Sequence, residues 1–321
     1  MYTQKINEQK DEDELLAVNW HLEPACNYAC DFCYAPLIEQ RKLPRLDEAS
    51  GVTLIRSIAM SGVEKINFVG GEPMLHPHIE AWIVAAKHAG MTTSIVSNGT
   101  RMTEDWLRRM RPYLDWLGLS IDASNDEIHA LLGRCLKGEK RAGKSEHLKR
   151  CLRVWRTAQA LGYGLKLNTV VTSVNADDDM SELVTKLKPH RWKIFRVLHI
   201  EGENDGRVDP LLITGDQFER YIRRHRIALE HLGQIEIVAE DNEDMLGTYA
   251  MVDPQGMVYT NLCGRYSYSE ESATEVGFAA AWAQVRTGFS QQRFEKRGGE
   301  WDWSTDSRPM LRLPLAEEAE S

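Results

Sequence analysis

Residues 26 to 33 read Cys26-Asn-Tyr-Ala-Cys30-Asp-Phe-Cys33, which places three cysteines in a CxxxCxxC spacing with an aromatic residue directly before the last. The remaining cysteines are scattered at positions 135, 151 and 263, so the chain does not carry a disulfide framework. Three thiolates so close together repel one another unless they share a cation. This stretch therefore predicts a metal centre.

The number of cysteines in this motif distinguishes two kinds of metal site. A structural zinc ion needs four protein ligands, usually supplied as two separated pairs, and no second pair of Cys or His at matching spacing occurs here. Three cysteines can instead bind three irons of a 4Fe-4S cubane and leave the fourth iron open to an outside ligand. We expect such a cluster. The alternative from a different functional class is a non-catalytic, zinc-bound interaction module.

Outward from the cysteines, short strand patterns alternate with helical patterns, beginning with the strand LLAVNWHL at 15–22. Further strands are expected at 64–70, 91–97, 115–121, 163–171 and 191–198, with helical stretches near 46–62, 78–89, 103–110, 125–160 and 177–187. Such βα repeats imply parallel strands with helices outside, and six repeats are too few for a closed eight-stranded barrel. We therefore predict an α/β fold, a partial (βα)6 barrel with an open side.

The regular alternation fades from about residue 200 onward. A helix at 214–230, a strand at 234–239 and a hairpin at 249–261 are expected there, followed by the segment KRGGEWDW at 296–303. We predict three regions: a flexible N-terminus at 1–14, the barrel at 15–200, and a C-terminal extension at 201–321. The extension is expected to cover the barrel mouth and close the active site.

Composition narrows the classes of partner. The 321 residues are 42% hydrophobic, enough to bury a full core, and 39 Lys and Arg stand against 48 Asp and Glu, a net charge of -9. The net charge therefore gives no reason to expect binding to nucleic acid or to an anionic membrane. Any anion site must be a local concentration of cations. The acidic N-terminus lacks a signal-peptide pattern and no run of 18 apolar residues occurs. We expect a soluble cytoplasmic protein.

Polar residues on four of the expected strands share one face, because side chains alternate across a strand. The apolar residues between them should meet the outer helices. Unpaired ammonium groups in a low-dielectric interior are costly, so several lysines inside one barrel must receive a matching negative charge. The pattern predicts a polyanionic ligand. The inner-face residues are Asn19, His21, Lys65, Asn67, Lys166, Asn168 and Lys193.

Two other interpretations of these cations remain open. The inner lysines could pair with acidic neighbours such as Glu72 or Glu201, or extend to the barrel floor. Arg134 offers a bidentate group for phosphate, or is simply a surface helix residue. No Walker-type glycine loop exists, so side chains would have to hold any phosphates. A solvated loop best explains the neighbouring basic residues Lys137, Lys140, Arg141 and Lys144.

The CxxxCx(aromatic)C loop after a first barrel strand resembles the radical S-adenosylmethionine (SAM) superfamily. The resemblance implies that SAM chelates the open iron, and that electron transfer cleaves SAM into methionine and a 5′-deoxyadenosyl radical that abstracts hydrogen from the substrate. Gly70-Gly71-Glu72-Pro73 looks like the GGEP edge that meets the SAM amino group, although alone it also fits an ordinary turn. Further SAM contacts implied by the resemblance are Phe32, Ser120 and Asn168, while a strand-end cap would equally explain Ser120 or Asn98.

Longer stretches resemble the viperin family of antiviral radical SAM enzymes: VNWHLEPACNYACDFC, GVEKINFVGGEP, LKLNTVVTSVNADDDM, RWKIFRVLHIEGEN and KRGGEWDW. This resemblance implies conversion of CTP, GTP or UTP to its 3′-deoxy-3′,4′-didehydro derivative, a chain terminator for viral polymerases. It also implies that Lys166 or Tyr249 supplies a proton. The nucleoside triphosphate site implied by the matching motifs comprises Asn19, Lys65, Arg134, Lys166, Lys193 and Tyr249.

The resemblance further implies an electron donor of the flavodoxin or ferredoxin type. The acidic N-terminus departs from animal viperins, which begin with an amphipathic membrane-binding helix, so membrane attachment is not expected here. Among enzymes, the alternative is a radical SAM peptide modifier or glycyl-radical activase. Such proteins often carry additional cysteine clusters in a C-terminal extension, and Cys263 alone cannot bind one.

Overall fold

The structure is a computed structural model of the chain and describes residues 15–35, 39–233 and 235–303. One sheet of ten strands runs through these residues in the order β10-β9-β8-β1-β2-β3-β4-β5-β6-β7. Its strands are β1 (Ala17–Glu23), β2 (Lys65–Gly70), β3 (Thr92–Ser97), β4 (Trp116–Ser120), β5 (Gly164–Val171), β6 (Arg191–Arg196), β7 (Glu236–Glu240), β8 (Ala250–Val252), β9 (Met257–Thr260) and β10 (Ser267–Ser272).

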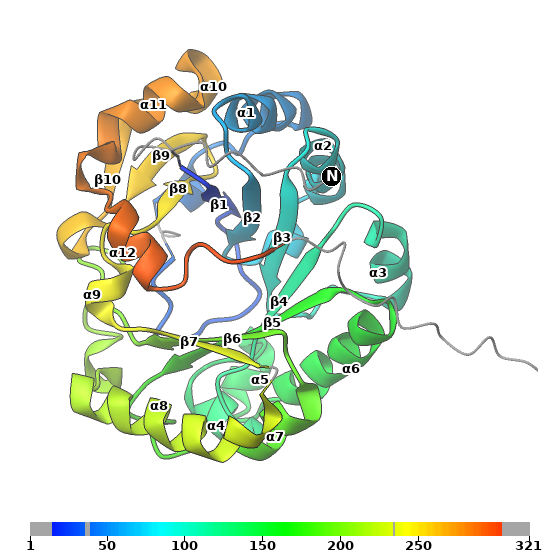
Figure 1. The fold of residues 1–321 in the computed structure, drawn as a ribbon, viewed down its shortest axis with the longest axis vertical. Coiled ribbons are helices and arrows are strands. Elements are labelled where there is room, and N and C mark those ends of the chain that lie inside the picture. The colour runs from blue at the N-terminus through cyan, green and yellow to red at the C-terminus, as the bar shows by residue number, and fades with distance from the viewer. Residues whose placement is uncertain (1–14, 36–38, 234, 304–321) are drawn as a thin grey trace, which may run out of the picture.

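The helices ring the outside of this curved sheet (Figure 1). They are α1 (Glu48–Met60), α2 (Ile79–His88), α3 (Glu104–Met110), α4 (Asp126–Leu131), α5 (Lys137–Arg141), α6 (His147–Ala160), α7 (Ser181–Leu187), α8 (Gly215–Leu229), α9 (Asn242–Met245), α10 (Ala273–Val276), α11 (Phe278–Val285) and α12 (Gln291–Lys296). Several of these helices are capped at their N-terminus by a short polar side chain. Asp47 accepts the Ser50 amide proton ahead of α1, and Thr214 forms a reciprocal capping box with Gln217 ahead of α8.

The first seven strands are all parallel to their neighbours, and the sheet does not close because β7 and β10 are its two edges. The predicted open α/β barrel is therefore confirmed. It is longer than expected at one end, since β7 continues the parallel series beyond β6. At the other end β8 lies parallel to β1, and β8 and β9 form the hairpin expected at 249–261.

Strand alternation separates the core from the barrel interior as expected. Ile66 and Phe68 of β2 are fully buried against the outer helices, as are Trp192 and Ile194 of β6. The polar residues between them line a cavity inside the barrel. Burying one such aromatic or aliphatic side chain contributes about 1.5–3 kcal/mol, which fixes the register and therefore the direction in which every inner residue points.

The last described segment closes the floor of the barrel, the end where the strands begin. Trp301 packs edge-on against Trp116, the first residue of β4, and Trp303 clusters with Leu16, directly before β1. Figure 1 shows this segment crossing the open centre of the barrel. Trp301 and Trp303 of the C-terminal extension therefore lie at the floor, whereas Tyr266 of the same extension donates to the Tyr34 carbonyl beside the cysteine loop at 2.8 Å. That the extension covers the mouth and closes the active site stays a prediction.

Two further expectations concerned the N-terminal stretch and membrane-spanning segments. The N-terminal stretch 1–14 lies outside them. Within residues 15–35, 39–233 and 235–303, no helix combines the length and apolar character needed to cross a bilayer.

Candidate active site

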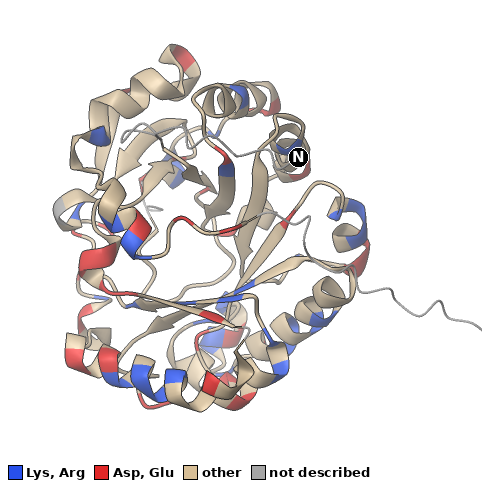
Figure 2. Ribbon diagram, viewed as in Figure 1, with Lys and Arg blue, Asp and Glu red and all other residues tan. Residues whose placement is uncertain are grey.

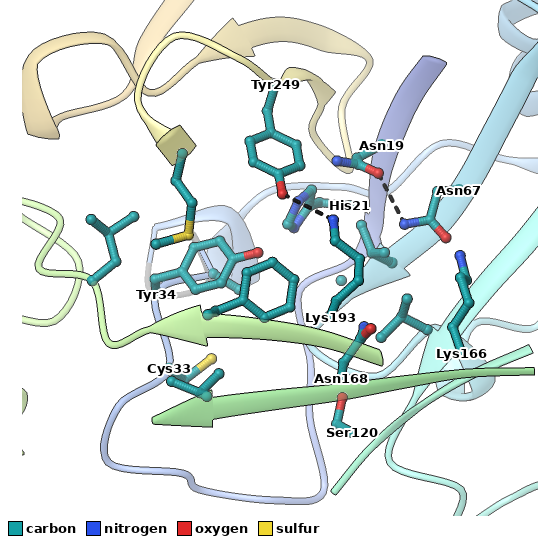
Figure 3. A pocket seen from close by; sticks show the side chains of 18 of the residues that line it. Asn19, His21, Cys33, Tyr34, Asn67, Ser120, Lys166, Asn168, Lys193 and Tyr249 are labelled. Carbon is teal, nitrogen blue, oxygen red and sulfur yellow. Dashed lines mark hydrogen bonds between the residues drawn. The ribbon is translucent and has the colours of Figure 1, made fainter. Parts of the chain in front are cut away.

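A deep cavity occupies the barrel interior, with about 1680 Å³ of empty space that is partly open to solvent. Figure 3 shows side chains from β1, β2, β5 and β6 converging on it. Every site residue predicted from the sequence lines this cavity: Asn19, Cys26, Cys30, Phe32, Cys33, Lys65, Gly70, Gly71, Glu72, Ser120, Arg134, Lys166, Asn168, Lys193 and Tyr249.

The cysteine loop (residues 26–33) follows β1 at the mouth of the cavity. All three of its cysteines are free, and burial raises the pKa of Cys26 to about 11. Thiolates at this depth therefore need positive charge beside them. Among the described residues, no three His, Cys, Asp or Glu side chains gather around one point as a single metal ion would require. A cubane places each cysteine on a separate iron, so this loop suits a cluster better than zinc.

Gly70 and Gly71 end β2 directly against the start of the cysteine loop. A Cβ on Gly71 would lie 2.4 Å from the Ala25 carbonyl oxygen, and one on Gly70 would lie 2.5 Å from that of Glu23. No other residue permits this approach without moving backbone. The Gly71 and Glu72 amides donate to the carbonyls of Glu23 and Ala25, at 2.6 and 2.9 Å. The glycines therefore form an edge that can face a ligand held at the cysteines.

Glu72 stabilises this edge from within the protein. Its fully buried carboxylate accepts hydrogen bonds from the Met74 amide, the Ser97 hydroxyl and the Asn98 amide, at 3.1, 2.7 and 2.8 Å. Burial raises the pKa of Glu72, although these bonds act in the opposite direction. Sequence reasoning did not select Ser97, whose place at the end of β3 was the available signal. The SAM contact predicted for Glu72 remains a prediction.

Ser120, the last residue of β4, is paired in the sheet with Asn168, which lies within β5. The Oδ1 atom of Asn168 is buried and has no hydrogen-bond partner among the described residues. An orphaned buried acceptor is costly, so this atom suits a hydroxyl or amino group of a ligand. Its position near the cysteine loop fits the SAM contact predicted for it.

A neutral histidine connects the cysteine loop to β4. The buried His147 Nε2 lies 2.7 Å from the Ser120 carbonyl, which can only accept, so Nε2 carries the proton. Its Nδ1 atom must then accept from the Tyr28 hydroxyl, 3.0 Å away. Arg150 donates to the same hydroxyl at 3.0 Å. Burial holds the pKa of His147 well below its ordinary value, so this link between the loop and Ser120 stays neutral.

Two lysines near the floor have no carboxylate partner. The Lys65 ammonium lies 4.7 Å from the ring centre of Trp301 and 5.0 Å from that of Trp303, and it forms no ion pair with a described carboxylate. Lys166 donates to the Ser94 hydroxyl at 2.5 Å. Burial, and then repulsion from neighbouring cations, lowers the pKa of both lysines well below its ordinary value. Among the described residues, neither lysine forms the alternative pair with an acidic neighbour such as Glu72 or Glu201.

Lys193 is paired, but with a residue that sequence reasoning missed. The buried Glu240 carboxylate at the end of β7 lies 2.5 Å from Lys193 and 3.1 Å from Arg297, and it accepts the Tyr249 hydroxyl proton. Burial lowers the pKa of Lys193 to about 8, while attraction to Glu240 opposes that shift. Burial favours protonation of Glu240, but Arg297 and Lys193 overcome it and lower its pKa to about 2. The carboxylate is therefore ionised.

Arg134 and Asn19 occupy the two flanks of the cavity. Arg134 donates to Asp122 at 2.5 Å and lies over the Phe32 ring, which places it beside the cysteine loop. Its predicted phosphate contact remains a prediction. The side chain of Asn19 accepts a 2.9 Å hydrogen bond from Asn67, and Figure 3 shows both amides facing Lys193 and Lys166.

Comparison with known proteins provides independent evidence. Residues 22–187 match the Radical SAM superfamily. The chain is 37% identical over 293 residues to an S-adenosylmethionine-dependent nucleotide dehydratase of Flammeovirga pacifica, covering 89% of this chain and 96% of that protein. It is 32% identical to the dehydratase RSAD2 of Siniperca chuatsi, covering 90% of this chain and 79% of that protein. It spans only 60% of a similarly named Lacinutrix mariniflava protein, at 36% identity over 92% of this chain.

Solved structures support the same fold. Native anSMEcpe with bound AdoMet superposes with a TM-score of 0.67 at 16% identity, covering 91% of this chain and 87% of that one. Streptococcus suis SuiB bound to S-adenosylmethionine gives 0.67 at 14% identity, covering 87% and 67%. At such identities the likeness concerns architecture alone.

Proposed function

Because the chain belongs to the radical SAM superfamily and, within it, to the S-adenosylmethionine-dependent nucleotide dehydratases, we propose that it removes water from the ribose of a nucleoside triphosphate. The product would be the 3′-deoxy-3′,4′-didehydro derivative of CTP, GTP or UTP, a chain terminator for viral polymerases that serves antiphage defence. The observation that carries this proposal is the pair of buried lysines, Lys65 and Lys166, neither of which forms an ion pair with a carboxylate of the described residues.

The depth of each group in the barrel suggests how such a substrate lies. Lys65 is the first residue of β2, whereas the cysteine loop and Ser120 stand where strands end. A triphosphate drawn to the lysines at the floor would leave the ribose higher, facing Ser120 and Asn168. The Trp301 ring lies 4.7 Å from the buried Lys65 ammonium, and low solvent exposure strengthens a charge-assisted hydrogen bond to phosphate.

The cofactors of this family are SAM and a 4Fe-4S cluster, which when bound supply the radical chemistry that removes a hydrogen atom from the substrate. In our proposal Cys26, Cys30 and Cys33 hold the cluster. The SAM contacts are the glycine edge (Gly70, Gly71) with Glu72, Phe32, Ser120 and Asn168. This arrangement is supported by the fit of the cysteine loop to a cluster, and by the orphaned acceptor on Asn168.

Loss of the 3′-hydroxyl requires a proton, for which we propose Tyr249 or Lys166. The Tyr249 hydroxyl already donates to Glu240, so its own proton points away from the cavity. Lys193 lies 3.4 Å from the same oxygen and can pass a proton to it. For Tyr249 to protonate the leaving hydroxyl, its O–H must turn from Glu240 towards the ribose, and Lys193 can then replace the proton that the phenol gives up. Lys166 is the other candidate, because its lowered pKa suits proton donation.

The test is a turnover experiment under anaerobic conditions. Reduced, cluster-loaded protein is incubated with SAM and each of CTP, GTP and UTP, and 5′-deoxyadenosine and nucleotide masses are followed. We expect one of the three to stimulate SAM cleavage and to yield a product lighter by one water. If none of them does so, the proposal is wrong.

We also propose that the reaction takes place in the cytoplasm, because it needs reduced thiols and a nucleotide pool.

A further inference from the structure

The outer side of the cysteine loop is covered by residues 131–144. Tyr28 forms an isolated β-bridge with Leu136, and the Lys137 amide donates to the Asn27 carbonyl at 3.2 Å. Lys140 donates to the Ala29 carbonyl at 2.9 Å. Helix α5 is therefore joined directly to the loop that carries the cysteines, with the cavity on the loop's other side.

This cover is basic although the protein is acidic. Residues 131–144 carry five Lys and Arg against one Glu, whereas the chain as a whole has a net charge of -9. Lys137, Arg141 and Lys144 are exposed and form no ion pair among the described residues. Figure 2 marks Lys and Arg in blue along the ribbon, and five residues join α4 to α5 in the chain.

The same segment holds an exposed apolar side chain. Leu131, the last residue of α4, has 69% of its surface exposed, which is unusual for a leucine. The carbonyl of the next residue, Leu132, accepts the Asp31 amide proton at 3.2 Å. The backbone that follows α4 therefore lies next to the cysteine loop. Small protein contacts that are guided by electrostatics typically combine an exposed apolar residue with unpaired charges of one sign.

We propose that this docking face (Leu131, Lys137, Arg141 and Lys144) binds a small acidic one-electron carrier protein that reduces the cluster. SAM and substrate would occupy the cavity side of the loop, so an electron donor must approach from the outer side. The carrier gives up one electron and the cluster accepts it, with no bond formed or broken. Repulsion by the acidic remainder of the protein would direct an acidic carrier to this face. Weak electron-transfer contacts bury little area, which matches so small a patch.

The experiment compares two reductants on the cluster-loaded protein. One is reduced flavodoxin, an acidic carrier, and the other is photoreduced deazaflavin, a small molecule that needs no docking face. The test variant is Lys137→Glu/Arg141→Glu/Lys144→Glu. The control is Arg220→Glu/Arg223→Glu/Arg226→Glu, which reverses three exposed charges on α8, a helix that packs against α7. Cluster bleaching is followed by stopped-flow absorbance, and binding of oxidised flavodoxin by calorimetry.

We expect the test variant alone to lose roughly 10- to 100-fold in the flavodoxin-driven rate at low salt, together with weaker flavodoxin binding. Its deazaflavin-driven rate should match that of the unmodified protein. An unchanged flavodoxin rate would overturn the proposal, and so would an equal loss with both reductants, because the segment would then be structural. Neither readout requires a nucleotide, so failure of the proposed dehydration would be seen separately.

Discussion

At the scale of single residues, Glu240 decides how much positive charge the cavity offers. It is the only carboxylate among the described residues that contacts Lys193, and it also binds Arg297 and Tyr249. An incoming phosphate must therefore share these two cations with a fixed anion. The carboxylate lowers the cost of burying two cations in the empty site but weakens their attraction for substrate.

Replacing Glu240 with Gln should separate these two effects. Breaking a buried ion pair typically costs about 3–5 kcal/mol, so we expect a lower melting temperature without nucleotide. Because the amide carries no negative charge, the triphosphate should bind more tightly and restore more stability than it does in the unmodified protein. Glu182→Gln, which breaks a surface pair with Lys186, is the control and should change little. Weaker triphosphate binding by Glu240→Gln would contradict this account.

At the scale of strands and helices, alternation made the interior predictable. Lys166 and Lys193 could be placed inside because apolar residues flank each of them, and Lys65 because Ile66 and Phe68 take the opposite face of its strand. A register slip would bury charge against the helices. Glu240 followed the same alternation in β7, but that strand was predicted to lie outside the barrel. Arg297 and Trp301 could not be placed, because they come from a segment without periodicity whose position depends on packing against strand starts far away in sequence.

The end of β2 offers a test at this scale. Gly71→Ala places a methyl group 2.4 Å from the Ala25 carbonyl oxygen, so β2 or the cysteine loop must shift. We expect far-UV circular dichroism to remain native while iron content or SAM affinity falls by roughly tenfold, which corresponds to about 1.4 kcal/mol. Gly138→Ala in α5 meets nothing within 4 Å and is expected to keep both properties. Native iron content and SAM affinity in Gly71→Ala would show that the close approach is unimportant.

At the scale of the whole molecule, an acidic protein concentrates cations at the centre of its barrel. The groups that surround Lys193 come from several elements: Glu240, Tyr249, Lys166, Arg191 and Arg297. The folded pKa of Lys193, about 8, lies below its ordinary 10.5. Between those values the unfolded chain holds a proton that the folded lysine has lost, so this residue's contribution to stability rises with pH.

Substrate binding should return the proton that Lys193 loses on folding. Phosphate favours the charged form of each nearby lysine, so we expect triphosphate binding near pH 8 to take up protons and its affinity to fall as pH rises further. Calorimetry in two buffers of different ionisation enthalpy measures the number taken up. Lys166→Met should reduce it, because the pKa of Lys166 is also lowered. Proton release, or no exchange, would mean that these lysines are already fully charged in the free protein.

The central claim is that the buried lysines hold a triphosphate, and equilibrium binding tests it most directly. The affinity of the preferred nucleoside triphosphate is compared with that of its nucleoside, in the unmodified protein and in Lys65→Met and Lys166→Met, each with its iron content checked. At about 1.5–3 kcal/mol for each charge-assisted hydrogen bond, the triphosphate should bind at least about 100-fold more tightly than the nucleoside, and each variant should lose about tenfold or more of that advantage. Equal affinities for triphosphate and nucleoside, or an undiminished preference in both variants, would contradict it.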